Sequence, residues 1–264
     1  MTPNDTPTVP APDDHAPLAC LNCEASLTGA FCAQCGQSAA THRFTLAHLL
    51  HEIPHSIWHV DRGLPYTLKE MLVRPGHTIR RYLAGQRVDL FRPVALVLLL
   101  AGAASFLLLL LHIEQLEPNR AAVTAAGQEA IAANHLVFKY FAWFTIAMLP
   151  LYSLLSWVLL RRLRYNFVEH LMANALVIGG VLAVQILFLP LLAWARHSPW
   201  LKTLYLIDTF LLPVYQMWAF TLLALGAYRL AGSLWRGFII AFIGLLGNSL
   251  LLNLLSLWLV RLTH

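Results

Sequence analysis

The stretch Asp61–Pro93, DRGLPYTLKEMLVRPGHTIRRYLAGQRVDLFRP, separates two parts of the chain that differ in character. The sequence before it is polar and holds all four cysteines, whereas most of the sequence after it is apolar. Over 264 residues the chain is 58% hydrophobic and only 12% charged, which is typical of membrane proteins rather than of soluble domains. We therefore interpret Asp61–Pro93, called the hinge below, as the place where a polar head meets a bilayer.

The hinge is expected to form two short helices on the membrane surface. Thr67 with Glu70 three residues later fits a capping box, which predicts a helix that starts at Thr67. That helix should end just before Pro75, and Pro75-Gly76 predicts a turn. A short basic helix follows, and Gly85 is its expected C-terminal cap.

Five apolar segments follow the hinge, and each is long enough to cross about 30 Å of hydrocarbon as a helix. They cover about 93–111, 136–160, 171–194, 204–230 and 235–260. Pro93 suits the first turn of the first segment, since its missing amide donor would be unpaired there anyway. We predict an all-α integral membrane protein, with a membrane domain at 93–264 preceded by an amphipathic and basic juxtamembrane segment at 43–92.

Basic residues predict the orientation of these spans. Most of the 18 Lys and Arg residues would lie on the side of the N-terminus: Arg43, Arg62, Lys69, Arg74, Arg80, Arg81, Arg87, Arg92, Arg161, Arg162, Arg164, Arg229 and Arg236. The positive-inside rule then predicts a cytoplasmic N-terminus and, with an odd number of spans, a periplasmic C-terminus in a bacterial inner membrane. Because the basic residues cluster beside apolar spans, we expect them to meet anionic lipid and not nucleic acid.

The four cysteines form two C-x2-C pairs, Cys20/Cys23 and Cys32/Cys35, with eight residues between the pairs. Two such turns can direct four sulfurs at one ion, which predicts a structural zinc site in a small ribbon at 20–37. Iron or a redox-active dithiol pair is the alternative. The ribbon is either a folding device or a docking module for a partner. Residues 1–19 are rich in proline and lack the features of a signal peptide, so we expect a disordered tail.

Two further groups are candidates for chemistry. Four histidines, His48, His51, His55 and His59, share one arc of a predicted amphipathic helix from Phe44 to Val60. Either these histidines bind a second metal, or they are partly exposed imidazoles that flank an apolar helix face lying on the lipid headgroups. Glu169 and His170 lie at the start of the third span. Either the pair transfers a proton or binds a cation, or Glu169 only stabilises the helix start as an acid.

Several of these elements resemble a known family. They are Cys35-Gly36-Gln37 at the end of the ribbon, and Asp61, Thr67, Pro75-Gly76, Tyr82, Gly85, Arg87 and Pro93 in the hinge. Together they resemble DUF3667, a bacterial membrane family of unknown function, over the ribbon, the hinge and the Glu169-His170 region. Gln86 departs from the pattern, where the family is expected to have a basic residue. The resemblance implies a zinc ribbon on a multispanning protein and supplies no activity.

Three functions remain open on sequence grounds. The first is a non-catalytic protein whose ribbon and hinge recruit a partner or contact anionic lipid, with Arg74, Arg80, Arg81 and Arg87 as the lipid or phosphate contacts. The second is an enzyme acting on a lipid or lipid-linked phosphate at the cytoplasmic leaflet. Its catalytic candidates are Arg87, with Arg80 and Arg81, on the phosphate and Asp61, Glu169 or His170 in acid-base roles. The third is a transporter or channel, although no charged stripe runs through any span. We favour the first.

Overall fold

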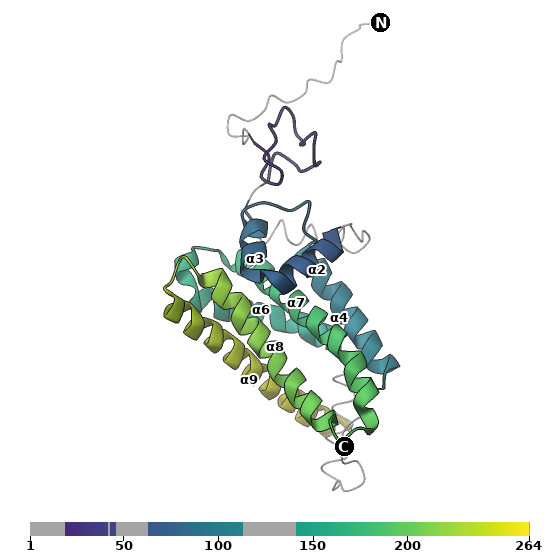
Figure 1. The fold of residues 1–264 in the computed structure, drawn as a ribbon. Helices are drawn as coiled ribbons and strands as arrows, with labels where there is room; N and C mark the ends of the chain where they lie inside the picture. The colour runs from purple at the N-terminus through teal and green to yellow at the C-terminus, as the bar shows by residue number, and fades with distance from the viewer. Residues whose placement is uncertain (1–18, 42, 46–62, 113–140, 264) are drawn as a thin grey trace, which may run out of the picture.

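The computed structural model describes residues 19–41, 43–45, 63–112 and 141–263 (Figure 1). Its α-helices are α2 (Gly63–Val73), α3 (Pro75–Leu83), α4 (Pro93–Leu110), α6 (Phe141–Leu159), α7 (Phe167–Trp194), α8 (Leu201–Ala224) and α9 (Leu230–Thr263). The described residues include five helices, α4 and α6 to α9, that are long and apolar enough to cross a membrane. The predicted fold class is therefore confirmed: an all-α chain with five candidate spans and a four-cysteine cluster before them.

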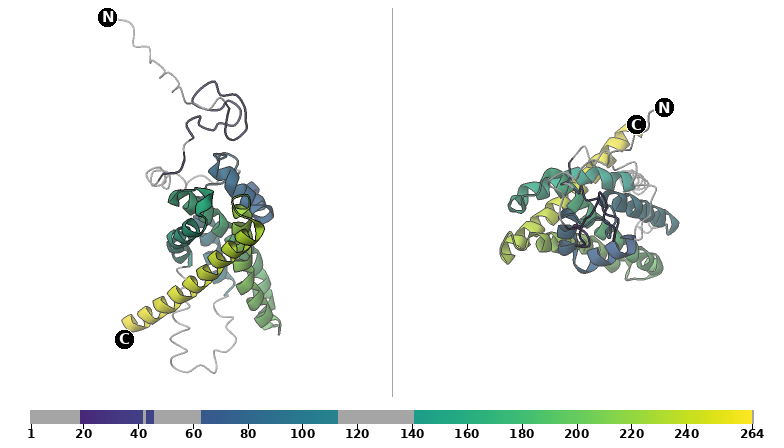
Figure 2. Two further views of the ribbon diagram at one scale, coloured as in Figure 1. Left: turned by 90° about the vertical axis from the view of Figure 1, so that its left-hand side faces the viewer. Right: turned by 90° about the horizontal axis from the view of Figure 1, so that it is seen from above.

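Helix α7 is the centre of the bundle. It is the most buried of the five long helices and packs against α4, α6 and α8. Helix α9 lies outside, against α8 and α6, and runs diagonally across the bundle (Figure 2). Helices α2 and α3 cover the end of the bundle nearest the ribbon, where α3 contacts α8 and both contact α7 (Figure 1).

Several boundaries of the long helices differ from the predicted spans, and two of these differences have a local cause. The third helix begins at Phe167 because Asn166 and Glu169 form a capping box, in which each side chain accepts from the other residue's backbone amide. The fourth helix ends at Ala224, because a tight turn at Leu225–Tyr228 with Gly226 at φ +98° breaks the apolar run. Hydropathy alone does not reveal that turn, since its residues are themselves mostly apolar.

The capping box predicted at Thr67 is wrong. Helix α2 starts earlier, at Gly63, and Thr67 lies fully buried inside it. Its Oγ1 instead accepts from the backbone N–H of Phe91 at 2.7 Å, and Glu70 pairs with Arg74. The hydroxyl thus satisfies a backbone donor of the segment that leads into α4, which a local sequence pattern cannot indicate.

Pro75-Gly76 is not a turn between helices but the first turn of α3, with Arg74 as its N-cap. Gly76 is required there for a close approach: a Cβ would lie 2.5 Å from the backbone carbon of Leu222 in α8. Two other hinge predictions hold, since α3 ends at Leu83 before Gly85, which has φ +111°, and Pro93 starts α4.

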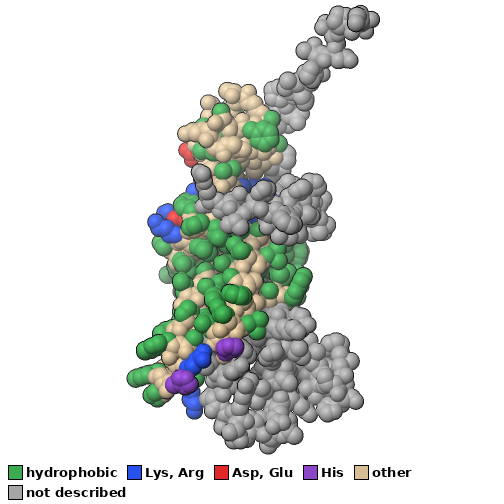
Figure 3. Space-filling model, turned by 90° about the vertical axis from the view of Figure 1, so that its right-hand side faces the viewer, with side chains coloured by type: hydrophobic (Ala, Val, Ile, Leu, Met, Phe, Trp, Pro, Cys, Tyr) green, Lys and Arg blue, Asp and Glu red, His purple; other side chains and the backbone are tan. Residues whose placement is uncertain are grey.

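The polarity of the surface agrees with a bilayer around the long helices. Figure 3 shows apolar side chains over the flank of the bundle, with Lys and Arg near the ribbon end and Lys, Arg and His at the opposite end. Exposed large apolar residues on the long helices include Phe106, Leu187, Phe210, Phe238 and Leu246. A hydrocarbon environment removes the cost of leaving such side chains uncovered.

Candidate metal centre

The two C-x2-C pairs fold in nearly the same way. The segments Cys20–Ser26 (CLNCEAS) and Cys32–Ser38 (CAQCGQS) repeat one another, and in each the fifth residue donates its amide to the first residue's carbonyl at 2.9 Å. That fifth residue, Glu24 or Gly36, has a positive φ of 62° or 78°. This left-handed turn folds each segment into a knuckle that presents both of its sulfurs on one side.

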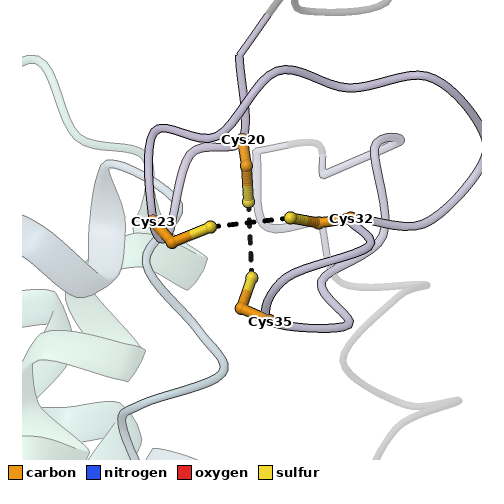
Figure 4. A group of neighbouring side chains, drawn as sticks. All are labelled: Cys20, Cys23, Cys32 and Cys35. Carbon is orange, nitrogen blue, oxygen red and sulfur yellow. Dashed lines mark hydrogen bonds between the residues drawn. The ribbon is translucent and has the colours of Figure 1, made fainter.

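The four thiol sulfurs converge on one point (Figure 4). Cys20 Sγ lies 3.5 Å from Cys35 Sγ, Cys23 Sγ lies 3.5 Å from Cys32 Sγ, and all four atoms lie within 4.8 Å of one another. All four cysteines are free thiols. A tetrahedral zinc with Zn–S bonds of about 2.3 Å requires sulfur separations of about 3.8 Å, so the arrangement fits a four-thiolate metal site.

Backbone amides favour the thiolate form, which a metal needs, at one cysteine of each knuckle, whereas burial and the neighbouring thiols raise the pKa of Cys23 to about 12 and also raise the pKa of Cys35. The backbone amides of Cys23 and Asn22 lower the pKa of Cys20, and Asn22 N lies 3.5 Å from that sulfur. In the second knuckle, hydrogen bonds led by the amide of Cys35 lower the pKa of Cys32 to about 6. A thiolate at neutral pH is the metal-binding form of cysteine.

The ribbon rests on the loop between α3 and α4 through Gln37. The side chain of Gln37 is buried; its Nε2 donates to the carbonyl of Gly85 at 2.8 Å, and its Oε1 accepts from the amide of Arg87 at 3.1 Å. One side-chain amide therefore satisfies a backbone acceptor and a backbone donor of the same loop, as a neighbouring strand would.

A second contact joins the first knuckle to the same loop. Asn22 Nδ2 donates to Asp89 Oδ2 at 3.1 Å. Leu21 lies so close to Gly85 that a Cβ on this glycine would be 2.7 Å from Leu21 Cδ1. Gly85 thus meets two requirements, the positive φ that ends α3 and the approach of the ribbon.

The chain that leaves the ribbon continues along the hinge to α7. Phe44 is buried, its ring stacks on Tyr82 with centroids 5.5 Å apart, and the guanidinium carbon of Arg87 lies 3.8 Å from its centroid. Arg43 donates to both carboxylate oxygens of Glu169, at 2.8 and 2.5 Å. Hydrogen bonding to Glu169 raises the pKa of Arg43 further.

The arginines proposed to contact phosphate all have protein partners. Arg74 forms an ion pair with Glu70 at 2.8 Å, and this pairing lowers the pKa of Glu70. Arg80 donates to the carbonyls of Leu222 at 2.6 Å and Leu223 at 3.2 Å. Arg81 lies 3.8 Å from Glu70 and donates to Tyr66 and Gln86, and Arg87 covers Phe44. These residues are held by the fold, and their contact with lipid stays a prediction.

Glu169 and His170 point in different directions. Glu169 faces Arg43, whereas His170 Nδ1 lies 3.0 Å from Ser156 Oγ inside the bundle, where both residues are fully buried. Asn174 Nδ2 donates to the same serine oxygen at 2.8 Å. Among the described residues, Glu169 pairs with Arg43, Arg87 covers Phe44 and His170 contacts Ser156, so these contacts do not join Arg87, Glu169 and His170 in one catalytic group.

Some predicted sites fall outside the described residues. They are the tail at 1–18, the histidines His48, His51, His55 and His59, and Asp61. Of the residues that carry the ribbon contact, Gln37 and Gly85 are part of the family resemblance, but sequence gave no reason to pair them. Arg43 and Phe44 showed no signal beyond their place at the start of a basic, apolar segment.

A comparison with family models finds one match, to the family described as a protein of unknown function (DUF3667), over residues 61–104. This range covers α2, α3 and the first part of α4, and it confirms the resemblance for the hinge. The ribbon and Glu169-His170 lie outside the matched range. Neither the curated proteins nor the solved structures contain a match.

Proposed function

We propose that the protein is a non-catalytic, multispanning protein of a bacterial inner membrane whose cytoplasmic head, a zinc ribbon fixed to the hinge, contacts anionic lipid headgroups. The observation that carries this proposal is a set of exposed arginines around the ribbon end of the bundle. These residues, the arginine rim, are Arg74, Arg161, Arg164 and Arg229. The carbonyl of Arg164 accepts from Arg43, which places this part of the rim beside the exit of the ribbon.

The rim is suited to headgroups because of where it lies. Arg161 and Arg164 bound the short turn η3 (Arg161–Leu163) between two candidate spans, and Arg229 precedes α9. An arginine at the end of a span lies at the level of the lipid phosphates, and its guanidinium binds a phosphate through two parallel hydrogen bonds. Near an anionic leaflet each such residue contributes about 1 kcal/mol.

The enzyme alternative is less well supported by the described residues. The pair that most resembles a nucleophile with its base, Ser156 and His170, has no exposed surface and lies in the bundle core. A four-thiolate zinc has no open coordination position for a substrate. We therefore assign the metal a structural role. A transporter or channel stays an alternative.

The test is the affinity of the full chain, purified in detergent, for phosphatidylglycerol and for phosphatidylcholine, measured by native mass spectrometry. We expect tighter binding of phosphatidylglycerol. The double variant R161Q/R229Q removes two cations and should weaken that binding by about 30-fold, at about 1 kcal/mol each. Both side chains are exposed, so the fold should tolerate both changes.

Lys202→Gln is the matched control, because Lys202 is exposed near the start of α8 at the opposite end of the bundle. It should leave the affinity for phosphatidylglycerol unchanged. Equal affinities of the unaltered chain for the two lipids would overturn the proposal. The alternative of a protein partner docked on the ribbon predicts that result.

A further inference from the structure

The two knuckles of the ribbon differ at the positions that touch the hinge. In the repeat, Gln37 of the second knuckle corresponds to Ala25 of the first, and Asn22 of the first corresponds to Gln34 of the second. Gln37 and Asn22 are both buried against the loop between α3 and α4, whereas Gln34 is exposed. The two knuckles therefore share their metal-binding residues, and each knuckle carries one hinge-binding side chain at a different position of the repeat.

Both hinge-binding side chains lie within two residues of a metal-ligating cysteine. Asn22 lies between Cys20 and Cys23, and Gln37 follows Cys35 by two positions. The carbonyl of Gln37 also accepts from the amide of Cys32 at 2.8 Å, which closes the second knuckle. A ribbon this small has little core of its own, so its metal supplies much of the free energy that keeps both knuckles folded.

The loop that the ribbon holds, Gly85–Asp89, connects α3 to the chain entering α4. Its contacts with the ribbon are the amide pair on Gln37, the Asn22–Asp89 hydrogen bond and the contact of Leu21 with Gly85, whereas Gln86 accepts from Arg81 of α3 and the backbone of Asp89 lies against Gly63 of α2. Without a folded ribbon, the carbonyl of Gly85 and the amide of Arg87 lose these partners.

We propose that the ribbon is an intramolecular clamp whose closure depends on bound metal: with zinc in place Gln37 and Asn22 hold the Gly85–Asp89 loop, and loss of the metal releases it. Release frees the backbone groups of the loop at Gly85 and Arg87 and the Asp89 carboxylate from the ribbon, and so changes what the head presents to the membrane. The inference rests on the proposed structural zinc. It gives that zinc a task beyond the ribbon, namely control of the hinge.

The experiment is hydrogen/deuterium exchange of the full chain in detergent, with zinc and after a strong zinc chelator, alongside elemental analysis of each sample. We expect a single equivalent of zinc before chelation. After chelation, peptides covering 85–89 should exchange roughly tenfold faster, as expected when a backbone hydrogen bond is lost. Peptides within 172–183 of α7 should not change, because that stretch is packed between other helices.

Variants separate the clamp from the metal site itself. Gln37→Ala should speed exchange at 85–89 to a similar extent while the chain keeps its zinc, since Gln37 is not a ligand. Gln34→Ala, an exposed glutamine in the same knuckle, is the control and should change neither exchange nor zinc content. Unchanged exchange at 85–89 after chelation, or in Gln37→Ala, would overturn the clamp.

Failure of this test is distinguishable from failure of the proposed function. The lipid experiment reads the affinity for phosphatidylglycerol, which depends on Arg161 and Arg229, and neither residue touches the ribbon. A chain that prefers phosphatidylglycerol but shows no effect of chelation would overturn only the clamp. A chain that purifies without metal would overturn the premise of the clamp, which is the structural zinc.

Discussion

At the scale of single residues, two glycines in helices offer a direct comparison. Gly76, in α3, lies against the backbone of α8, where a Cβ would come within 2.5 Å of Leu222 and 2.6 Å of Leu223. Gly102, in α4, has nothing within 4 Å of the place where a Cβ would stand. Glycine is a poorer helix former than alanine at both positions, but only at Gly76 does a neighbouring helix leave no room for a Cβ.

We expect Gly76→Ala to destabilise the protein by about 1–3 kcal/mol, because the backbone of α8 must move to admit the methyl group. Gly102→Ala should instead be neutral or stabilise by up to about 1 kcal/mol through helix propensity. Thermal or denaturant unfolding in detergent measures both. Equal effects of the two substitutions would contradict the close approach of α3 to α8.

The buried polar group in the core gives a second expectation. Asn174 Nδ2 donates to Ser156 Oγ in α6 and to the carbonyl of His170, each at 2.8 Å, with all three residues fully buried. Asn174→Ala should cost about 0.6–2 kcal/mol, the range for such hydrogen bonds between helices in membranes. Gln34→Ala, a change at an exposed amide in the ribbon, is the control in the same unfolding assay. A loss at Asn174 no larger than that at Gln34 would contradict a role in joining α6 to α7.

Individual pairings of this kind were the least predictable part of the site. The cysteine spacing predicted the metal cluster because both its geometry and its chemistry are local. The partners of Gln37, Arg43 and Arg80 lie 48, 126 and 142 residues away along the chain, at Gly85, Glu169 and Leu222. A sequence pattern carries no information on such contacts until the helices have been placed.

At the scale of helices, arginines from other segments satisfy the carbonyls at several C-termini. Arg80 of α3 donates to Leu222 and Leu223 near the end of α8. Arg236 of α9 donates to Leu159 at the end of α6, and Arg196 donates to Leu111 beyond α4. The last carbonyls of a helix have no partner within the helix and carry partial negative charge, so a cation there is doubly favourable. Several basic residues used to predict orientation therefore also join helices.

Arg80→Met tests this capping role at α8. The substitution keeps much of the side chain's apolar volume and leaves the carbonyls of Leu222 and Leu223 without their donor, which should cost about 1–3 kcal/mol. Amides in the turn at 225–228 should exchange faster, since that turn is built on the end of α8. Lys69→Gln, an exposed change in α2, is the control. Unaltered exchange at 225–228 in Arg80→Met would show that α8 ends independently of α3.

At the scale of the whole molecule, hydropathy predicted the number of long helices but not their arrangement. Each span had to be long and apolar to enter a bilayer, and this requirement is visible residue by residue. The central position of α7 was not visible, because its apolar composition is close to that of α4 and burial depends on neighbours. The polar residues His170 and Asn174 in α7 were the available hint, since such side chains avoid lipid.

The arrangement leads to a prediction about orientation. With five spans the ribbon and the end of α9 must lie on opposite sides of the membrane, and Figure 1 places them at opposite ends of the bundle. Helices α2 and α3, η3 and the turn before α9 lie at the ribbon end (Figure 1), and the positive-inside rule assigns the end with their basic residues to the cytoplasm. Alkaline phosphatase fused after His264 should therefore be active, because it folds only after export, and green fluorescent protein at the same position should stay dark. Fusions after Gly226, in the turn between α8 and α9, should give the reverse result. Fluorescence of both fusions would mean that α9 does not cross the membrane, and fluorescence after His264 alone would mean that the orientation is reversed.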